Sequence, residues 1–124
     1  MEFKKQKPIY LQIADTMSER ILSGEWQSET RIASVREMAE QLGVNPNTAL
    51  RAFDYLQNAG IIYNRRGIGY FVSENAKGRT LDMQRTSFIE EELPFIVQQM
   101  NMLGLSFDDL KEEVAKLERK KDNN

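Results

Sequence analysis

Apolar residues recur at three- and four-residue steps near the start of the chain, which is the spacing of one face of an α-helix. This stretch runs from Pro8 to Gly24. Proline suits the first turn of a helix and glycine suits the position just past its end, so the two residues are the expected limits of the helix. Its apolar side chains are Ile9, Tyr10, Ile13, Met17 and Ile21.

Two shorter helices are predicted between residues 34 and 60, each with its own start and stop signals. Ser34 and Glu37 have the spacing of a capping box, and Gly43 ends the helix that they begin. Asn45 before Pro46 is a second start signal. The turn of three to four residues between these helices is the helix-turn-helix spacing. The positions predicted to be buried are Met38, Ala39, Leu42, Ala49, Ala52, Phe53 and Leu56.

Two β-type runs, residues 61–63 and 70–72, follow these helices. The loop between them carries Gly67 and Gly69, which predicts a β-hairpin. Residues 25–33 are too short and irregular for a helix and are a candidate for a short strand. We therefore predict a mainly α (α+β) fold, with a winged helix-turn-helix domain over residues 1–75.

A change in composition over residues 73–79 indicates a domain boundary, and residues 76–124 are predicted to form two amphipathic helices. Gly104 ends the first helix, and Ser106 with Asp109 caps the second. Pro94 should kink or interrupt the first helix near residues 90–93, because it removes a hydrogen bond. The apolar positions are Phe88, Ile89, Leu93, Phe95, Ile96, Met100, Met102, Leu103, Phe107, Leu110, Val114 and Leu117.

This apolar face is wider than one partner helix needs, and two helices cannot bury it alone. We therefore predict that residues 76–124 are a dimerisation arm that pairs with a second copy of the chain. The alternative is that the arm packs back onto the first domain of the same chain. The methionine and phenylalanine content would also fit a ligand pocket, but helical spacing favours a dimer core.

The 124 residues carry 17 Lys and Arg against 19 Asp and Glu, so the formal charge is -2. This near balance gives no overall argument for nucleic acid. The charge is unevenly distributed, however, because residues 1–73 hold nine basic and eight acidic side chains, whereas residues 74–124 hold eight and eleven. The first domain is thus close to neutral and the arm is acidic.

The absence of Cys and His excludes disulfides and Cys-type zinc sites and removes the usual general base. Gly-rich phosphate loops and nucleophile motifs are also missing, so we predict no enzyme, no metal site and no cofactor. The chain has no apolar stretch of signal-peptide or membrane-span length. We expect a cytoplasmic protein with no membrane partner.

Several short motifs lie between residues 8 and 73. They are Pro8-Ile-Tyr-x-Gln12, Ile21 with Gly24, Arg31-Ile-Ala-Ser34-x-Arg36, Ala39, Leu42-Gly-Val44, Thr48, Ala52, Leu56, Gly60-Ile-Ile62 and Gly67-x-Gly69-Tyr-Phe-Val72. As a set they resemble the amino-terminal domain of GntR-family transcriptional regulators. Val44-Asn-Pro-Asn-Thr48 and the short carboxy-terminal part resemble the YtrA subfamily, whose members carry two dimerisation helices instead of a large ligand-binding domain.

The resemblance implies a homodimeric repressor of its own operon and of adjacent ABC transporter-type genes, acting through an inverted-repeat operator in double-stranded DNA. The chain departs from the family pattern in three places. The chain has Ile32-Ala33-Ser34 where Leu-Pro-Ser is usual, and Glu29 where glycine is frequent. Asn45-Pro46 replaces the common Ser-Arg, so the DNA-contacting role of that arginine is not carried over.

The second helix of the helix-turn-helix is expected to enter the major groove. Its outward face carries Asn47, Arg51, Asp54 and Asn58. We predict that Asn47 and Arg51 read bases, because asparagine pairs with adenine and arginine with guanine. Asn45 and Thr48 are placed to contact phosphate at the start of this helix. The alternatives are helix caps for Asn45 and Thr48, and solvent exposure or an ion pair with Asp54 for Arg51.

The family resemblance also assigns Arg36 to DNA contact, with an ion pair to Glu40 as the alternative. In the predicted wing, Gly67 and Gly69 would let the turn approach the duplex, although any hairpin uses glycine. Arg65 and Arg66 would enter a minor groove or hold phosphate. Three lysines near the amino terminus are candidates for further phosphate contacts, namely Lys4, Lys5 and Lys7. The alternative is that they form a plain polar tail.

Two other functions are weighed against a DNA-binding regulator. A winged helix that binds proteins and has no DNA affinity is supported only by the acidic net charge. A switch that responds to a small-molecule effector would need a pocket between the carboxy-terminal helices, and apart from the methionine and phenylalanine content no sequence feature supports one.

Overall fold

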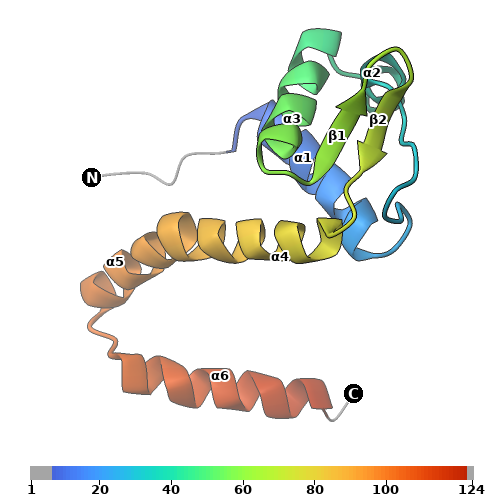
Figure 1. The fold of residues 1–124 in the computed structure, drawn as a ribbon. Coiled ribbons are helices and arrows are strands. Elements are labelled where there is room, and N and C mark those ends of the chain that lie inside the picture. The colour runs from blue at the N-terminus through green and yellow to red at the C-terminus, as the bar shows by residue number, and fades with distance from the viewer. Residues whose placement is uncertain (1–6, 123–124) are drawn as a thin grey trace. The chain divides into compact units, whose positions relative to one another are not determined.

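The computed structural model describes residues 7–122, and the chain divides into a first compact unit that ends at Thr86 and a second that begins at Ser87. Figure 1 shows the course of the chain. The elements of the first unit are α1 (Ile9–Leu22), α2 (Val35–Leu42), α3 (Pro46–Asn58), β1 (Ile62–Arg65), β2 (Gly69–Val72) and α4 (Ala76–Ser87). The second unit contains the π-helical turn η1 (Phe88–Glu92), α5 (Leu93–Leu103) and α6 (Phe107–Asp122). The winged helix-turn-helix with carboxy-terminal helices is confirmed.

The capping signals of the helix-turn-helix form as predicted. The Ser34 hydroxyl accepts a hydrogen bond from the Glu37 backbone N–H at 3.1 Å, and the Ser34 N–H donates to Glu37 Oε1 at 3.2 Å. Gly43 ends α2 with φ of 66°, in the left-handed region that glycine adopts without strain. Local side-chain chemistry therefore sets the limits of α2.

The capping box of α2 is expected to weaken in acid. The Ser34 backbone N–H, its hydroxyl and then Arg31 hold the pKa of Glu37 below its usual value. The folded pKa lies below the unfolded one, so this stabilisation is present above the unfolded pKa and is lost as the pH falls through the folded pKa. In urea unfolding, the stability difference between the parent and Glu37→Gln should close as the pH falls. A difference that is constant with pH would contradict this.

Removing the other half of the box tests the cap itself. Ser34→Ala deletes the oxygen that accepts from the Glu37 N–H, and it should lower the free energy of unfolding by about 1 kcal/mol at neutral pH. The same urea titrations measure this change.

The core of the first unit lies between α1, α3 and the hairpin. The largest fully buried side chains are Met17 and Ile21 of α1, Met38 of α2, Phe53 and Leu56 of α3, and Ile61, Ile62 and Val72 of the hairpin region. The ring of Phe53 also meets Tyr70 edge to face, with centroids 4.8 Å apart. This packing directs the inner face of α3 into the core and leaves its opposite face to solvent, as the sequence pattern predicts.

The hairpin is antiparallel, with Ile62 opposite Val72 and Arg65 opposite Gly69. The expected short strand within residues 25–33 is reduced to one bridge, between Arg31 and Phe71. Glu29, at the position where the family often has glycine, adopts a φ of 64°. The Tyr63 hydroxyl donates to Glu29 Oε2 at 2.8 Å, which also raises the pKa of Tyr63. A hydrogen bond to the hairpin thus accompanies a backbone conformation that suits glycine.

The polar stretch over residues 73–79 is part loop and part helix, because α4 begins at Ala76. Ala76 and Thr80 are fully buried, and Met83 packs against the same core. The first compact unit therefore continues past residue 75, where the change in composition indicated a boundary, to Thr86.

Two buried hydroxyls in the first unit lack hydrogen-bond partners among the described residues, Ser18 Oγ on α1 and Thr80 Oγ1 on α4. A buried, unpaired hydroxyl costs free energy. The isosteric change Thr80→Val should therefore raise the free energy of unfolding by about 1 kcal/mol in urea denaturation. Thr86→Val, at an exposed position of the same helix, is the matched control, and it should change stability by less than about 0.5 kcal/mol. A lower free energy of unfolding in Thr80→Val would show that the Thr80 hydroxyl has a hydrogen-bond partner.

Pro94 interrupts the second unit as predicted. The residues before it form η1, in which the Leu93 N–H donates to the carbonyl of Phe88. Proline has no N–H to offer the carbonyl of Glu90, so the regular α-helical pattern fails in the turn before it. Gly104 then ends α5, and Ser106 with Asp109 forms a reciprocal cap on α6 at 3.1 and 2.9 Å.

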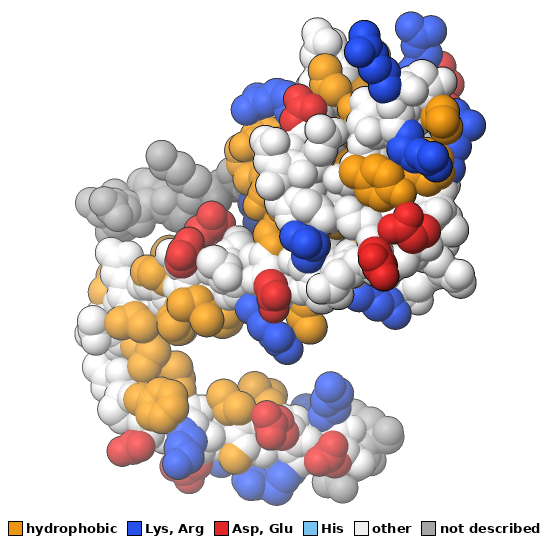
Figure 2. Space-filling model, in the orientation of Figure 1, with side chains coloured by type: hydrophobic (Ala, Val, Ile, Leu, Met, Phe, Trp, Pro, Cys, Tyr) orange, Lys and Arg blue, Asp and Glu red, His pale blue; other side chains and the backbone are white. Residues whose placement is uncertain are grey.

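The second unit has an apolar surface. None of the residues of η1, α5 and α6 is buried. Figure 2 shows hydrophobic side chains gathered along α5 and α6. The exposed ones are Phe88, Ile89, Leu93, Val97, Met102, Leu103, Leu105, Phe107, Val114 and Leu117.

Candidate nucleic-acid interface

The start of α3, the helix α2 and the turn of the hairpin lie at the same end of the first unit (Figure 1). Lys and Arg side chains gather at this end in the space-filling view (Figure 2). The fold thus brings the helix-turn-helix and the wing, which are far apart in sequence, to the same end of the first unit.

The outward face of α3 is the one that the periodicity predicts. Asn47, Arg51, Asp54 and Asn58 are exposed, whereas Ala49, Ala52, Phe53 and Leu56 are buried. Leu50 lies on the same outward face and is 40% exposed. Leu50 was not among the candidate site residues, although its spacing of three residues from Asn47 was a usable signal. An apolar side chain there is suited to contact a thymine methyl group.

Asn45 acts as the helix cap that was its alternative role. Its Oδ1 accepts a hydrogen bond from the Asn47 N–H at 2.8 Å, which leaves the amide Nδ2 as the donor that a phosphate would meet. Thr48 is half-buried, and within the described part of the chain its hydroxyl makes no cap hydrogen bond.

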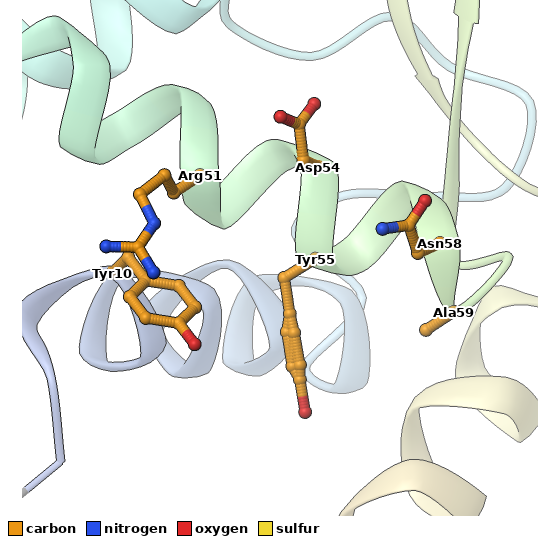
Figure 3. Close-up of a pocket in the computed structure, with 6 residues that line it drawn as sticks. All are labelled: Tyr10, Arg51, Asp54, Tyr55, Asn58 and Ala59. Carbon is orange, nitrogen blue, oxygen red and sulfur yellow. The ribbon is translucent and has the colours of Figure 1, made fainter.

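Arg51 contacts an aromatic ring of another helix. Its guanidinium carbon lies 4.2 Å from the centroid of the Tyr10 ring, on α1. Arg51 forms no ion pair with Asp54 among the described residues, so that alternative is wrong. The two side chains instead border an open hollow of about 540 Å³ on the outer surface of α1 and α3, shown in Figure 3. The other lining residues are Tyr10, Tyr55, Asn58 and Ala59.

Asp54 brings a negative charge to this face of α3. Burial, and then the charge of Asp54, raises the pKa of Tyr70 on β2. The acidic group therefore lies near the strand that leads out of the wing. An acidic side chain repels phosphate and can accept a hydrogen bond from the amino group of cytosine. It therefore favours contact with bases over contact with the DNA backbone.

Arg36 is exposed on α2, and it forms no ion pair with Glu40 in the part of the chain that the structure describes. The ion pair that was its alternative role is therefore absent. Lys7 does pair, with Asp15 Oδ2 at 2.8 Å. Lys4 and Lys5 lie outside the described residues.

The wing carries Arg65 at the end of β1 and Arg66 in the turn, and both are exposed. The guanidinium of Arg65 lies 5.2 Å from the Phe71 ring centroid. Gly67 has a φ of 79°, and the Ile68 N–H closes the turn on the Arg65 carbonyl at 2.8 Å. A left-handed φ at this position explains the glycine without reference to DNA.

Gly69 differs from Gly67 because it makes room for a side chain. A Cβ atom at Gly69 would lie 3.0 Å from Nε of Arg31, and its φ of 140° also disfavours other residues. The guanidinium of Arg31 therefore lies against the base of the wing, at the residue that is paired with Arg65 in the hairpin. Arg31 was part of the family motif but was not among the candidate site residues, because only the bridge to Phe71 brings it to the wing.

Within residues 7–122, no group of three or more acidic side chains is arranged to hold a metal ion. No helix in the described part of the chain combines the length and hydropathy needed to cross a membrane.

A winged helix-turn-helix with exposed arginines on its recognition helix and wing defines a DNA-binding transcriptional regulator. The profile of the bacterial regulatory proteins of the gntR family matches residues 9–72, and the chain belongs to this family. It is 34% identical over 114 residues to the transcriptional repressor YtrA of Bacillus subtilis (strain 168), covering 92% of this chain and 87% of that protein.

Solved structures agree. A GntR-family transcriptional regulator from Bacteroides thetaiotaomicron matches with a TM-score of 0.78 and 38% identity over 92% of this chain and 99% of the other. The DNA-binding domain of AraR in complex with its operator ORX1 matches with a TM-score of 0.53 and 29% identity over 55% of this chain and 82% of the other. These relatives are regulators, and the prediction that the chain is not an enzyme is confirmed.

Proposed function

We propose that the protein is a homodimeric repressor that binds an inverted-repeat operator and controls its own operon and adjacent ABC transporter-type genes. The observation that carries the proposal is the combination of a basic end on the first unit with an uncovered apolar surface on the second. The name of the full-length relative YtrA as a repressor supports the direction of the regulation.

The apolar surface of residues 76–124 supports pairing with a second copy. Leu103 and Phe107 are each 72% exposed and Leu117 is 66% exposed, so α5 and α6 both contribute. Phe95, Ile96, Met100 and Leu110 are only half-buried within the chain. Monomeric proteins rarely expose a continuous patch of this kind. A two-fold symmetric dimer buries the same patch on both copies.

A two-fold dimer requires a two-fold operator. Its recognition helices would enter successive major grooves about 34 Å apart, which is one turn of DNA. We assign base reading to Asn47 and Arg51, phosphate contact to Asn45 and Thr48, and DNA contact to Arg36. The wing contacts come from Arg65 and Arg66, with Gly67 and Gly69 shaping the turn.

Selection of duplexes from a random library by the purified protein tests this function. The expected result is one enriched inverted repeat, bound by two protomers in analytical ultracentrifugation, that represses in vitro transcription when placed in a promoter. Enrichment of no sequence would reject operator recognition. A complex with one protomer on a single half-site would reject the dimer, and increased transcription would reject repression.

A further inference from the structure

We propose that Tyr10 is a positioning residue for operator recognition, because its ring on α1 holds the guanidinium of Arg51 on α3 in the orientation that reads a base. The inference rests on the proposed DNA surface, in which Arg51 is a base-reading residue. It adds a contribution to sequence specificity from a helix outside the helix-turn-helix.

The geometry shows contacts to Tyr10 from two positions of α3. The guanidinium carbon of Arg51 lies 4.2 Å from the Tyr10 ring centroid. Tyr55, one helical turn further along α3, meets the same ring edge to face, with centroids 6.4 Å apart and an interplanar angle of 70°. Figure 3 shows the Arg51 and Tyr10 side chains meeting between the two helices, with Tyr55 beside them.

The backbone beneath Tyr10 is well anchored. Ile13 and Ala14, one turn along α1, are buried in the core. On the other side, Ala52 next to Arg51 is also fully buried. Because both helices are held by the core, the fold fixes the backbone positions from which the ring and the guanidinium reach each other.

Contact with the face of an aromatic ring leaves the recognition chemistry of Arg51 intact. An aromatic ring covers the face of the guanidinium plane, whereas the N–H donors lie in the plane and point outward. Those donors are the groups that bind O6 and N7 of guanine. A free arginine side chain samples many rotamers, and the contact with the ring restricts them before DNA arrives. Tyr10 thus orients Arg51 without contacting the base itself.

The inference predicts a specific pattern of affinities. The Arg51→Ala variant first identifies the base pair that it no longer distinguishes. Discrimination is then the ratio of two Kd values, one for the selected operator and one for a duplex changed at that base pair. Tyr10→Leu should reduce this discrimination by about two- to five-fold, the range for an exposed cation–π contact. Tyr10→Phe keeps the ring and should retain it. In an Arg51→Ala background, Tyr10→Leu should cause no further change.

A second readout needs no DNA. In the free protein, ¹⁵N relaxation of the Arg51 Nε–H group should report higher mobility in Tyr10→Leu than in the parent. The Nε–H group of Arg65, which lies over Phe71 in the wing, is the internal control and should not change. Tyr10 is only half-buried and leucine keeps an apolar side chain there, so the fold is expected to survive.

The outcomes separate this inference from the proposed function. Three results would each overturn the positioning role while leaving Arg51 as a base reader. They are unchanged discrimination in Tyr10→Leu, an equal loss of discrimination when Tyr10→Leu is made in the Arg51→Ala background, and unchanged mobility of Arg51. If Arg51→Ala itself distinguishes every base pair as the parent does, the assigned DNA surface fails and the inference fails with it.

Discussion

Replacing Arg51 with alanine is expected to relax the base preference of the protein and to cost about 1–3 kcal/mol of operator affinity. The physical reason is that the guanidinium offers two in-plane donors to one guanine edge, and alanine offers none. Fluorescence anisotropy with the selected operator and a set of single-base variants measures the change. The loss should be confined to one base pair in each half-site.

Arg65→Ala is the matched comparison, because Arg65 is also exposed and also lies over an aromatic ring. It should weaken binding to all sequences alike and reduce the slope of log Kd against log salt by about 1 for each wing, since it removes a phosphate contact. If the two variants lose affinity with the same sequence dependence, the division of roles between recognition helix and wing is wrong.

The second large effect is expected at the proposed dimer interface. Leu103→Glu places a charge in the apolar surface of α5 and should shift the protein from dimer to monomer. Burying one leucine contributes about 1.5–3 kcal/mol, and the symmetric interface contains two copies of it. Leu103 is 72% exposed within the chain, so the fold of one protomer should not suffer. Sedimentation equilibrium measures the dissociation constant of the dimer.

Gln98→Glu is the control for this experiment. It adds the same charge to the same helix at an exposed polar position on the other side of α5, and it should leave both the dimer and operator binding unchanged. Leu103→Glu should lose about 100-fold or more in operator affinity, because the second half-site no longer benefits from a high effective concentration. A monomeric variant that still binds the operator at full affinity would contradict the coupling of dimerisation to recognition.

The charge distribution qualifies the expected DNA affinity. Residues 74–124 hold eight basic and eleven acidic side chains, so the arm repels phosphate, while the first domain is nearly neutral. Non-specific affinity, which depends mostly on net charge, should therefore be modest. Specific contacts from residues such as Asn47 and Arg51 must supply more of the binding energy.

Local signals explain why the fold could be predicted. Three kinds of local signal act through hydrogen bonds within a few residues. They are the capping boxes at Ser34 and Ser106, the glycines at the ends of α2 and α5, and Pro94. Such interactions are visible in the sequence because both partners are adjacent in it. The long-range features were missed for the opposite reason. The beginning of α4 within a polar stretch depends on burial of Ala76 and Thr80 against distant elements.

The sequence by itself determined the order of the elements from α1 to β2, the inward face of α3 and the identity of its outward residues, because helical periodicity needs only local spacing. It also determined the apolar surface of the arm. Only the tertiary structure decided what surrounds each arginine. The packing of α1 on α3 gives Arg51 an aromatic ring in place of Asp54, and the bridge to Phe71 brings Arg31 to the wing. These contacts join residues far apart in the chain, and the core that holds their elements together sets them.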